Sequence, residues 1–162
     1  LLSREMYRQC FEEHGGSIVH LGADYENGMP GMGHNGAARA GLSNLTFTSS
    51  VEWAASGVRI NCVIPGFIGT TGLDRYPESA WQGLRNVVSK APINRHGTAA
   101  EISAAVVFLM SEMAAFITGI DLRVDGGIHH GRGGFLFKAK DGSSPPAFNG
   151  FHRDETAELL KD

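Results

Sequence analysis

Strand-like and helical segments alternate along the first 127 residues of this chain, and that alternation limits the possible folds more than any other feature. The pattern predicts a helix at 1–14, a strand at 16–22, a helix at 36–56, a strand at 58–66, a helix that opens at a capping box formed by Thr98 and Glu101, and a strand at 119–127. Strands that alternate with helices pair in parallel, because each helix crosses over and packs on a face of the sheet. The sequence therefore predicts an α/β fold.

The composition fits one hydrophobic core and argues against several functions. Of the 162 residues, 42% are hydrophobic, and the net charge is −3, so we expect no nucleic-acid partner and no attraction to an anionic membrane. No apolar run is long enough for a membrane span. Cys10 and Cys62 form no disulfide or zinc pattern, which favours an intracellular, reducing compartment. His129 and His130 are adjacent, so their side chains diverge, and we expect no metal site.

The stretch GMGHNG, at residues 31–36, has the G-x-G-x-x-G spacing of a dinucleotide-binding loop. In that motif the first glycine directly follows a strand, so that the pyrophosphate reaches the N-terminus of a helix. Here eight residues (23–30) separate Gly22 from Gly31, and the next strand ends at Pro65-Gly66 without a carboxylate for the ribose. We therefore interpret the stretch as a loop entering a helix, and we expect no contact with cofactor phosphates.

Five segments in order resemble the C-terminal half of a short-chain dehydrogenase/reductase: GGSIVHLG, GAARAGLSNLT, GVRINCVIPGFIGT, PINRHGTAAEISAAVVFLMSE and FITGIDLRVDGG. The resemblance implies the C-terminal half of a Rossmann-type doubly wound parallel sheet. Residues 1–128 would belong to this partial domain and residues 129–162 to a C-terminal tail. The family's phosphate-binding half lies outside these segments, so we expect this chain alone to bind NADPH weakly or not at all.

The expected catalytic positions depart from the usual family pattern of Ser, Tyr and Lys. Arg39 stands at the Lys position, Asn35 stands at the Tyr position, and the Ser position falls near Gly22 or Ala23. The stretch HNGAARAGLSNLT is similar to peroxisomal trans-2-enoyl-CoA reductases, which carry an Arg at the Lys position. The related 2,4-dienoyl-CoA reductases use a Tyr at the end of the preceding strand.

Tyr25 matches that second tyrosine position once the intervening loop is shortened by one residue. The resemblance therefore implies Tyr25, Asn35 and Arg39 as catalytic candidates. The alternatives are a Tyr25 ring that only packs at the strand end and an Arg39 that only faces solvent.

The strand that ends at Pro65-Gly66 leaves backbone groups at the carboxyl edge of the sheet, where α/β proteins bind ligands. In the family this segment covers the nicotinamide. The resemblance therefore implies that Pro65, Gly66, Ile68 and Thr70 contact NADPH, with Arg39 beside the nicotinamide ribose. Residues 71–94 match the variable flap that closes over acyl substrates.

These features together imply an NADPH-dependent oxidoreductase that reduces the 2,3 double bond of trans-2-enoyl-CoA thioesters in fatty acid metabolism. Its partners would be a fatty acyl-CoA substrate and a second copy of the chain, paired through helices 1–14 and 36–56. A catalytically inactive scaffold and a keto/hydroxy short-chain reductase remain as alternatives. The resemblance favours the peroxisome, whereas the final Leu-Leu-Lys-Asp is no peroxisomal signal and favours the cytoplasm.

Overall fold

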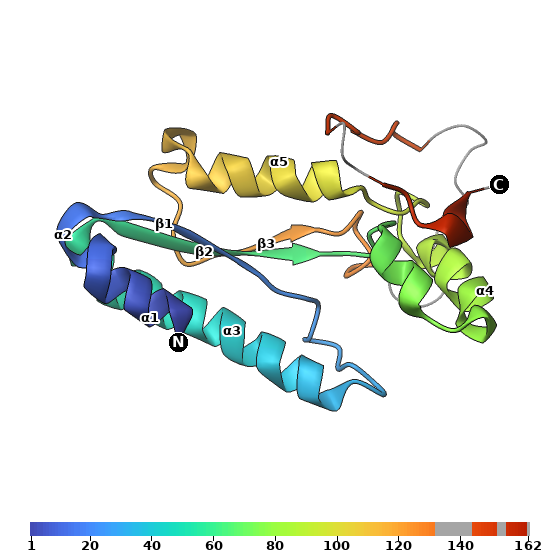
Figure 1. Ribbon diagram of the computed structural model, residues 1–162, viewed down its shortest axis with the longest axis horizontal. Coiled ribbons are helices and arrows are strands. Elements are labelled where there is room, and N and C mark those ends of the chain that lie inside the picture. The colour runs from blue at the N-terminus through green and yellow to red at the C-terminus, as the bar shows by residue number, and fades with distance from the viewer. Residues whose placement is uncertain (132–143, 152–154, 162) are drawn as a thin grey trace. The chain divides into compact units, whose positions relative to one another are not determined.

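A computed structural model describes residues 1–131, 144–151 and 155–161 (Figure 1). The chain forms two compact units. The first contains Leu1–Ile64 and Ala105–Arg123, and the second contains Pro65–Ala104 and Val124–Asp162. The expected boundary between a domain and a tail at residue 128 stays a prediction.

The helices and strands follow one another as the alternating pattern predicts. In chain order they are α1 (Leu2–Met6), η1 (Tyr7–Phe11), α2 (Glu12–His14), β1 (Gly16–Leu21), α3 (Gly33–Glu52), η2 (Ala54–Ser56), β2 (Val58–Pro65), η3 (Thr71–Arg75), α4 (Glu78–Asn86), η4 (Val87–Lys90), α5 (Ala99–Met110), η5 (Glu112–Ala114), β3 (Asp121–Val124) and η6 (Glu158–Leu160). The segment η1 is π-helical, and the other η segments are 3-10 turns.

The three strands form one sheet in the order β1-β2-β3. β1 and β2 are parallel, with Gly16 opposite Val58 and Leu21 opposite Val63. β3 runs in the same direction, because Cys62 N–H donates to Ile120 O and, four residues later on both strands, Gly66 N–H donates to Val124 O. The central strand β2 is the most buried of the three. The predicted parallel α/β sheet is confirmed.

Helical segments of the first unit cover both faces of its strands. On one face, where α1 and α3 lie together (Figure 1), His20 Nδ1 hydrogen-bonds Thr46 Oγ1 at 2.8 Å. On the other face, Asn61 Nδ2 donates to Ile117 O, after the end of α5, at 3.0 Å. Coverage of both faces is what a doubly wound sheet requires.

The expected helix at 1–14 is continuous from Leu2 to His14, with η1 as a wider turn in its middle. Its side chains are buried to different degrees along its length. Tyr7 stacks on Trp53 with ring centroids 4.4 Å apart, whereas Leu2 and Met6 are 76% and 43% exposed. Cys10 and Phe11, nearer the end of the helical segment, are half-buried, so only its first turns leave apolar side chains exposed in this chain.

The expected helix at 36–56 begins earlier and ends earlier. α3 starts at Gly33, inside the GMGHNG stretch, and Gly36 N–H donates to Met32 O at 3.0 Å. After Glu52 the chain tightens into η2 and turns at Gly57, which has a left-handed φ of 72°. The Gly36 amide is used within the helix, so the three glycine amides of this stretch are not all available to one anion. The absence of a contact with cofactor phosphates stays a prediction.

Two further elements bear on the sequence analysis. The predicted capping box is confirmed, since Glu101 N–H donates to Thr98 Oγ1 and Thr98 N–H donates to Glu101 Oε2. Within residues 71–94, the helix α4 follows Pro77 without a side-chain cap, so no capping residue marks its start. None of the helices in the described ranges has the length and apolar character needed to cross a membrane.

Candidate active site

Arg39 lies at the carboxyl end of β1, tied there by two hydrogen bonds. Its Nη1 donates to Leu21 O at 2.6 Å, and its Nε donates to Asn35 Oδ1 at 3.2 Å. Asn35 and Arg39 lie one turn apart on α3, and both are half-buried. The structure thus brings two of the three catalytic candidates together and places a fixed positive charge at the strand edge where α/β sheets bind ligands.

Gly22, directly after β1, has no room for a side chain. Its N–H donates to Val63 O at 2.8 Å, which continues the pairing with β2. A Cβ atom at this position would come within 2.9 Å of Cys62 Sγ and still closer to Ile64 Cδ1. Neither Gly22 nor its neighbour Ala23 supplies a hydroxyl, so the usual serine of the family has no counterpart at this point.

Tyr25 lies half-buried in the loop that connects β1 to α3, between two anchored carboxylates. Arg123 of β3 reaches Asp24 Oδ1 at 3.3 Å through Nη1 and Glu26 Oε1 at 2.8 Å through Nη2. Among the residues that the structure describes, the Tyr25 hydroxyl makes no hydrogen bond, and none joins Tyr25 to Arg39. The phenol is thus on an anchored loop with its donor available.

Sequence reasoning missed Arg123, although a signal was present. Arg123 stands between Leu122 and Val124 in a short strand whose four residues are all half-buried. A half-buried arginine needs an acidic or carbonyl partner, because an unpaired charge is costly to bury. Asp24 and Glu26, which flank Tyr25, are those partners.

The segment after β2 belongs to the second unit and lies in an extended conformation against Gly97. Gly69 N–H donates to Gly97 O at 3.0 Å, and Gly97 N–H donates to Phe67 O at 2.9 Å. Gly66 is required, because a Cβ atom there would come within 2.7 Å of Asp125 Cα. Within the described ranges, the N–H of Ile68 and the hydroxyl of Thr70 donate to no other residue. These two groups are available to a ligand.

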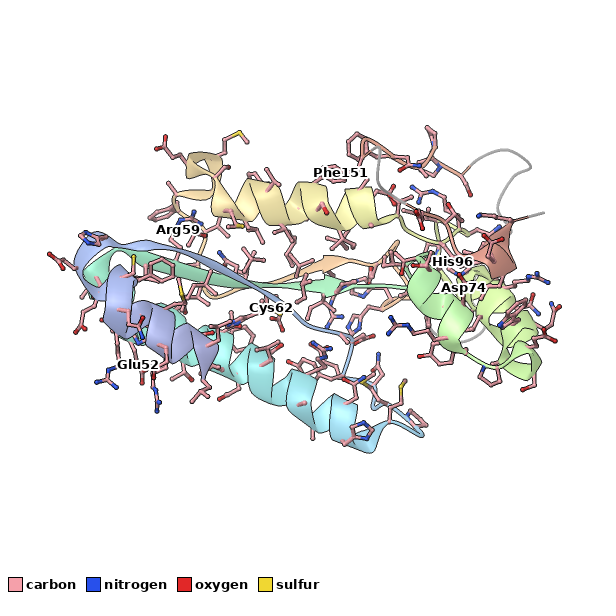
Figure 2. All side chains as sticks on the ribbon, viewed as in Figure 1. Glu52, Arg59, Cys62, Asp74, His96 and Phe151 are labelled. Carbon is pink, nitrogen blue, oxygen red and sulfur yellow. The ribbon has the colours of Figure 1, made fainter. Side chains whose placement is uncertain are left out.

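Cys62 and His20 have perturbed pKa values for structural reasons. Burial, followed by the negative charge of Asp121, raises the pKa of the Cys62 thiol to about 11, so this thiol stays protonated and unreactive. Burial lowers the pKa of His20, which is held between Ser3 and Thr46. Cys62 lies on β2, as Figure 2 shows. Neither residue is a candidate for proton transfer.

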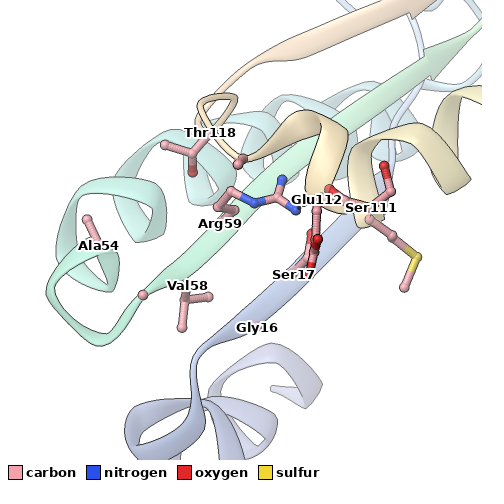
Figure 3. Close-up of a pocket in the computed structure, with 11 residues that line it drawn as sticks. Gly16, Ser17, Ala54, Val58, Arg59, Ser111, Glu112 and Thr118 are labelled. Carbon is pink, nitrogen blue, oxygen red and sulfur yellow. Dashed lines mark hydrogen bonds between the residues drawn. The ribbon is translucent and has the colours of Figure 1, made fainter.

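A cavity of about 540 Å³ opens at the amino ends of β1 and β2 (Figure 3). Arg59 and Glu112 line it, and Arg59 donates to Leu109 O at 2.8 Å, Ser111 O at 3.1 Å and Ile117 O at 3.3 Å. Leu109 lies in the last turn of α5, whose end carries partial negative charge. Arg59 is therefore the cap of α5, and the cavity lies at the strand edge opposite to the one where such sheets bind ligands.

No metal centre is apparent in the described parts of the chain, where no three His, Cys, Asp or Glu side chains gather closely enough to hold an ion. The rings of His129 and His130 lie edge to face with centroids 5.0 Å apart, and His129 N–H donates to Asp125 Oδ2.

The sequence of this chain is similar to one family of known proteins. A family model described as enoyl-(acyl carrier protein) reductase matches residues 1–129. The chain belongs to the short-chain dehydrogenase/reductase family. This finding confirms the resemblance, and with it the Rossmann-type sheet expected from the sequence.

Relatives in this family carry more than one activity in their names. The chain is 37% identical over 130 residues to a peroxisomal 2,4-dienoyl-CoA reductase of Pongo abelii, covering 78% of this chain and 44% of that protein. It is 35% identical over 129 residues to a 3-oxoacyl-[acyl-carrier-protein] reductase of Haemophilus influenzae, covering 79% of this chain and 52% of that protein.

A solved structure, the citronellol catabolism dehydrogenase AtuB of Pseudomonas aeruginosa, is 45% identical with a TM-score of 0.66. The match covers 79% of this chain and 48% of that one. The chain thus spans about half the length of the relatives it matches.

Proposed function

We propose that the protein containing this chain is an NADPH-dependent reductase of trans-2-enoyl-CoA thioesters. One observation carries the proposal. Asn35 stands where the family's tyrosine is expected, and its side-chain oxygen accepts a hydrogen bond from Arg39, while the Tyr25 hydroxyl has no partner among the described residues. An amide cannot carry the charge of a phenolate, so the acidic donor has to come from another position, and Tyr25 offers one.

Two groups of the second unit fit the expected cofactor. The Ile68 N–H and the Thr70 hydroxyl are donors without partners in the described chain, which suits the carbonyl and hydroxyl groups of a nicotinamide nucleotide. The Arg39 guanidinium has further N–H donors for a ribose beyond the two bonds described above. When bound, the cofactor supplies hydride to the β-carbon of the enoyl thioester.

The side chains of the chain then stabilise the charge that develops on the thioester oxygen. Tyr25 donates a hydrogen bond to this oxygen, a contribution of about 3–4 kcal/mol for a well-placed donor. Arg39 holds a permanent positive charge at the carboxyl end of β1 and favours the same charge development. Asn35 orients the guanidinium through its Oδ1.

A ketoreductase is the second candidate, because a relative at 35% identity is named 3-oxoacyl-[acyl-carrier-protein] reductase. The usual Ser, Tyr and Lys of such enzymes have no counterparts at Gly22, Asn35 and Arg39. The third candidate is a catalytically inactive scaffold. We favour the enoyl reductase over both because Arg39 and Tyr25 provide a charge and an acidic donor.

We also propose a homo-oligomer formed through α1 and α3. Both helices carry exposed apolar side chains: Leu2, Met6, Leu45, Phe47 and Val51. Surfaces of this kind mark contacts with other proteins, and sedimentation at micromolar concentration would detect a dimer or tetramer. By similarity to the Pongo abelii relative, whose name places it in peroxisomes, we propose a peroxisomal location, with the cytoplasm as the alternative.

The test is a substrate panel on the protein containing this chain, with trans-2-enoyl-CoA and 3-oxoacyl thioesters compared in the presence of NADPH. Tyr25→Phe should lower turnover of enoyl-CoA by about 10²–10³, as for loss of one oxyanion donor, with cofactor binding nearly unchanged. Tyr7→Phe, at a tyrosine of η1 that stacks on Trp53 and lies outside the proposed substrate and cofactor segments, is the matched control and should retain wild-type turnover.

Arg39→Lys should be milder than Arg39→Met, which removes the charge as well as the contact. Reduction of only the 3-oxoacyl substrate, or full activity of Tyr25→Phe, would exclude the proposed mechanism.

A further inference from the structure

The C-terminal residues 156–160, here called the C-terminal strap, are bound in a specific way within the second unit. Leu159 is 1% exposed, although it stands close to the end of the chain. Its N–H donates to Asp74 Oδ1 at 3.4 Å, and its C=O accepts from Arg85 Nε. Asp74 (labelled in Figure 2) lies on η3, and Arg85 lies on α4. Side chains thus hold both backbone groups of one buried leucine in place.

The C-terminal strap lies against the segment that we propose contacts the cofactor. Thr156 pairs with Thr70 in an antiparallel bridge, and Ala157 N–H donates to Gly69 O at 3.4 Å. Leu160 covers Gly69 so closely that a Cβ atom there would come within 2.7 Å of Leu160 Cδ1. The backbone at Gly69 is therefore held by the strap through its C=O and by Gly97 through its N–H.

These two hydrogen bonds at Gly69 determine which backbone and side-chain donors of the segment stay available to a ligand. The Gly69 N–H and C=O are both occupied, and Thr70 N–H donates to Ile68 O at 2.9 Å. The hydrogen-bond donors of this segment that remain available to a ligand are the Ile68 N–H and the Thr70 hydroxyl. These are the two groups that we propose contact the cofactor. Loss of the strap would remove the hold on one side of a short segment that contains a glycine, and that segment would gain conformational freedom.

We propose that Leu159 is a positioning residue: by anchoring the C-terminal strap, it holds Gly69 and Thr70 in the conformation that presents the cofactor donors. This inference rests on the proposed function, because it takes residues 65–70 as the nicotinamide segment. Arg85 and Asp74 act with Leu159, since they bind its backbone. None of the three residues needs to touch substrate or cofactor for this role.

The first measurement is hydrogen exchange in the full protein, which needs no activity. Leu159→Ala should speed exchange of the Gly69 and Thr70 amides by about tenfold or more, while amides of β2 keep their wild-type rates. Lys161→Ala is the matched control, because the Lys161 side chain is 54% exposed and pairs with Glu158 alone among the described acidic residues. Unchanged exchange at Gly69 and Thr70 in Leu159→Ala would overturn the inference.

The second measurement separates positioning from general stability. Leu159→Ala should raise the KM for NADPH about tenfold and change kcat much less, and Leu159→Met should restore most of the wild-type KM. A protein that ends at residue 154 should lose cofactor affinity and regain it when a synthetic peptide of residues 155–162 is added. The same peptide with Leu159→Ala should not restore affinity.

The outcomes distinguish the inference from the proposed function. If the wild-type protein binds no NADPH, the proposed function fails, and this inference fails with it. If the wild-type protein binds NADPH and Leu159→Ala speeds exchange at Gly69 without changing the KM, the proposed function stands and the positioning role is overturned. Failure of the peptide to restore affinity to the shortened protein also counts against the strap.

Discussion

The charge on Glu101 gives a stability prediction whose magnitude follows from the structure. Glu101 Oε1 accepts from Arg95 Nη2 at 2.6 Å, and Oε2 accepts from Arg95 Nη1 and from Thr98 N–H. Phe148 N–H also donates to Oε1. These bonds, that from Arg95 above all, lower the pKa of Glu101 from 4.5 to about 2, against the opposing effect of burial.

The free energy follows from the difference between the two pKa values. A shift from 4.5 to about 2 corresponds to about 3 kcal/mol at full strength, and solvent contact of the partly exposed pair reduces this to about 2 kcal/mol. Because the folded-state pKa is depressed, the unfolded chain binds more protons between pH 2 and 4.5. The contribution is therefore complete above pH 4.5 and is lost as the pH falls toward 2.

Glu101→Gln tests this charge with little change of shape, because the amide oxygen still accepts from Thr98 N–H and keeps the capping box. We expect the variant to be about 2 kcal/mol less stable than wild type in urea unfolding at pH 7, with a difference near zero at pH 2. Glu158→Gln, in an exposed pair with Lys161, is the control and should change stability by less than about 0.5 kcal/mol. A Glu101→Gln effect of equal size at both pH values would show that packing, not charge, stabilises this site.

Two further predictions concern the buried arginines of the first unit. Arg59→Met removes one of the donors to each of three backbone carbonyls at and after the end of α5, and it should lower the free energy of unfolding by about 1–3 kcal/mol, measured in urea. An effect below about 0.5 kcal/mol would contradict the capping role. Arg123→Met removes the ion pairs to the two carboxylates that flank Tyr25, so exchange of the Gly28 amide, which donates to Tyr25 O, should rise about tenfold while β1 stays protected. Equal exchange in Arg123→Met and wild type would show that the loop is held by other contacts.

The order of helices and strands was predictable from the sequence because periodicity reports burial directly. β2 is buried along most of its length, and its run VRINCVIP carries the apolar density of a central parallel strand. The capping box at Thr98 was visible because it depends on residues three apart. The start of α3 was not predictable to the residue, since Gly33 begins the helix although glycine has low helix propensity.

The candidate site was predictable only in its parts. The sequence placed Asn35 and Arg39 one helical turn apart, and the structure joins them by a hydrogen bond. It could not place Tyr25, because loop conformation depends on contacts distant in sequence, such as Arg123, which lies 99 residues after Asp24. The strap was missed for a similar reason. Nothing local in AELL at residues 157–160 indicates that Asp74 and Arg85 bind the backbone of its first leucine.

Arg59 and Asn61 show how a sequence can point to such long-range ties. Both stand in the central strand of a parallel sheet, where both faces are normally apolar. Polar side chains in that position require buried partners, and the partners that a doubly wound fold supplies are the free carbonyls where a covering helix ends. Arg59 donates to Leu109 O in the last turn of the apolar helix α5, and Asn61 donates to Ile117 O in the segment that follows this helix. A polar residue in a central strand therefore predicts the end of the helix that covers it, even though the partner lies about 50 residues further along the chain.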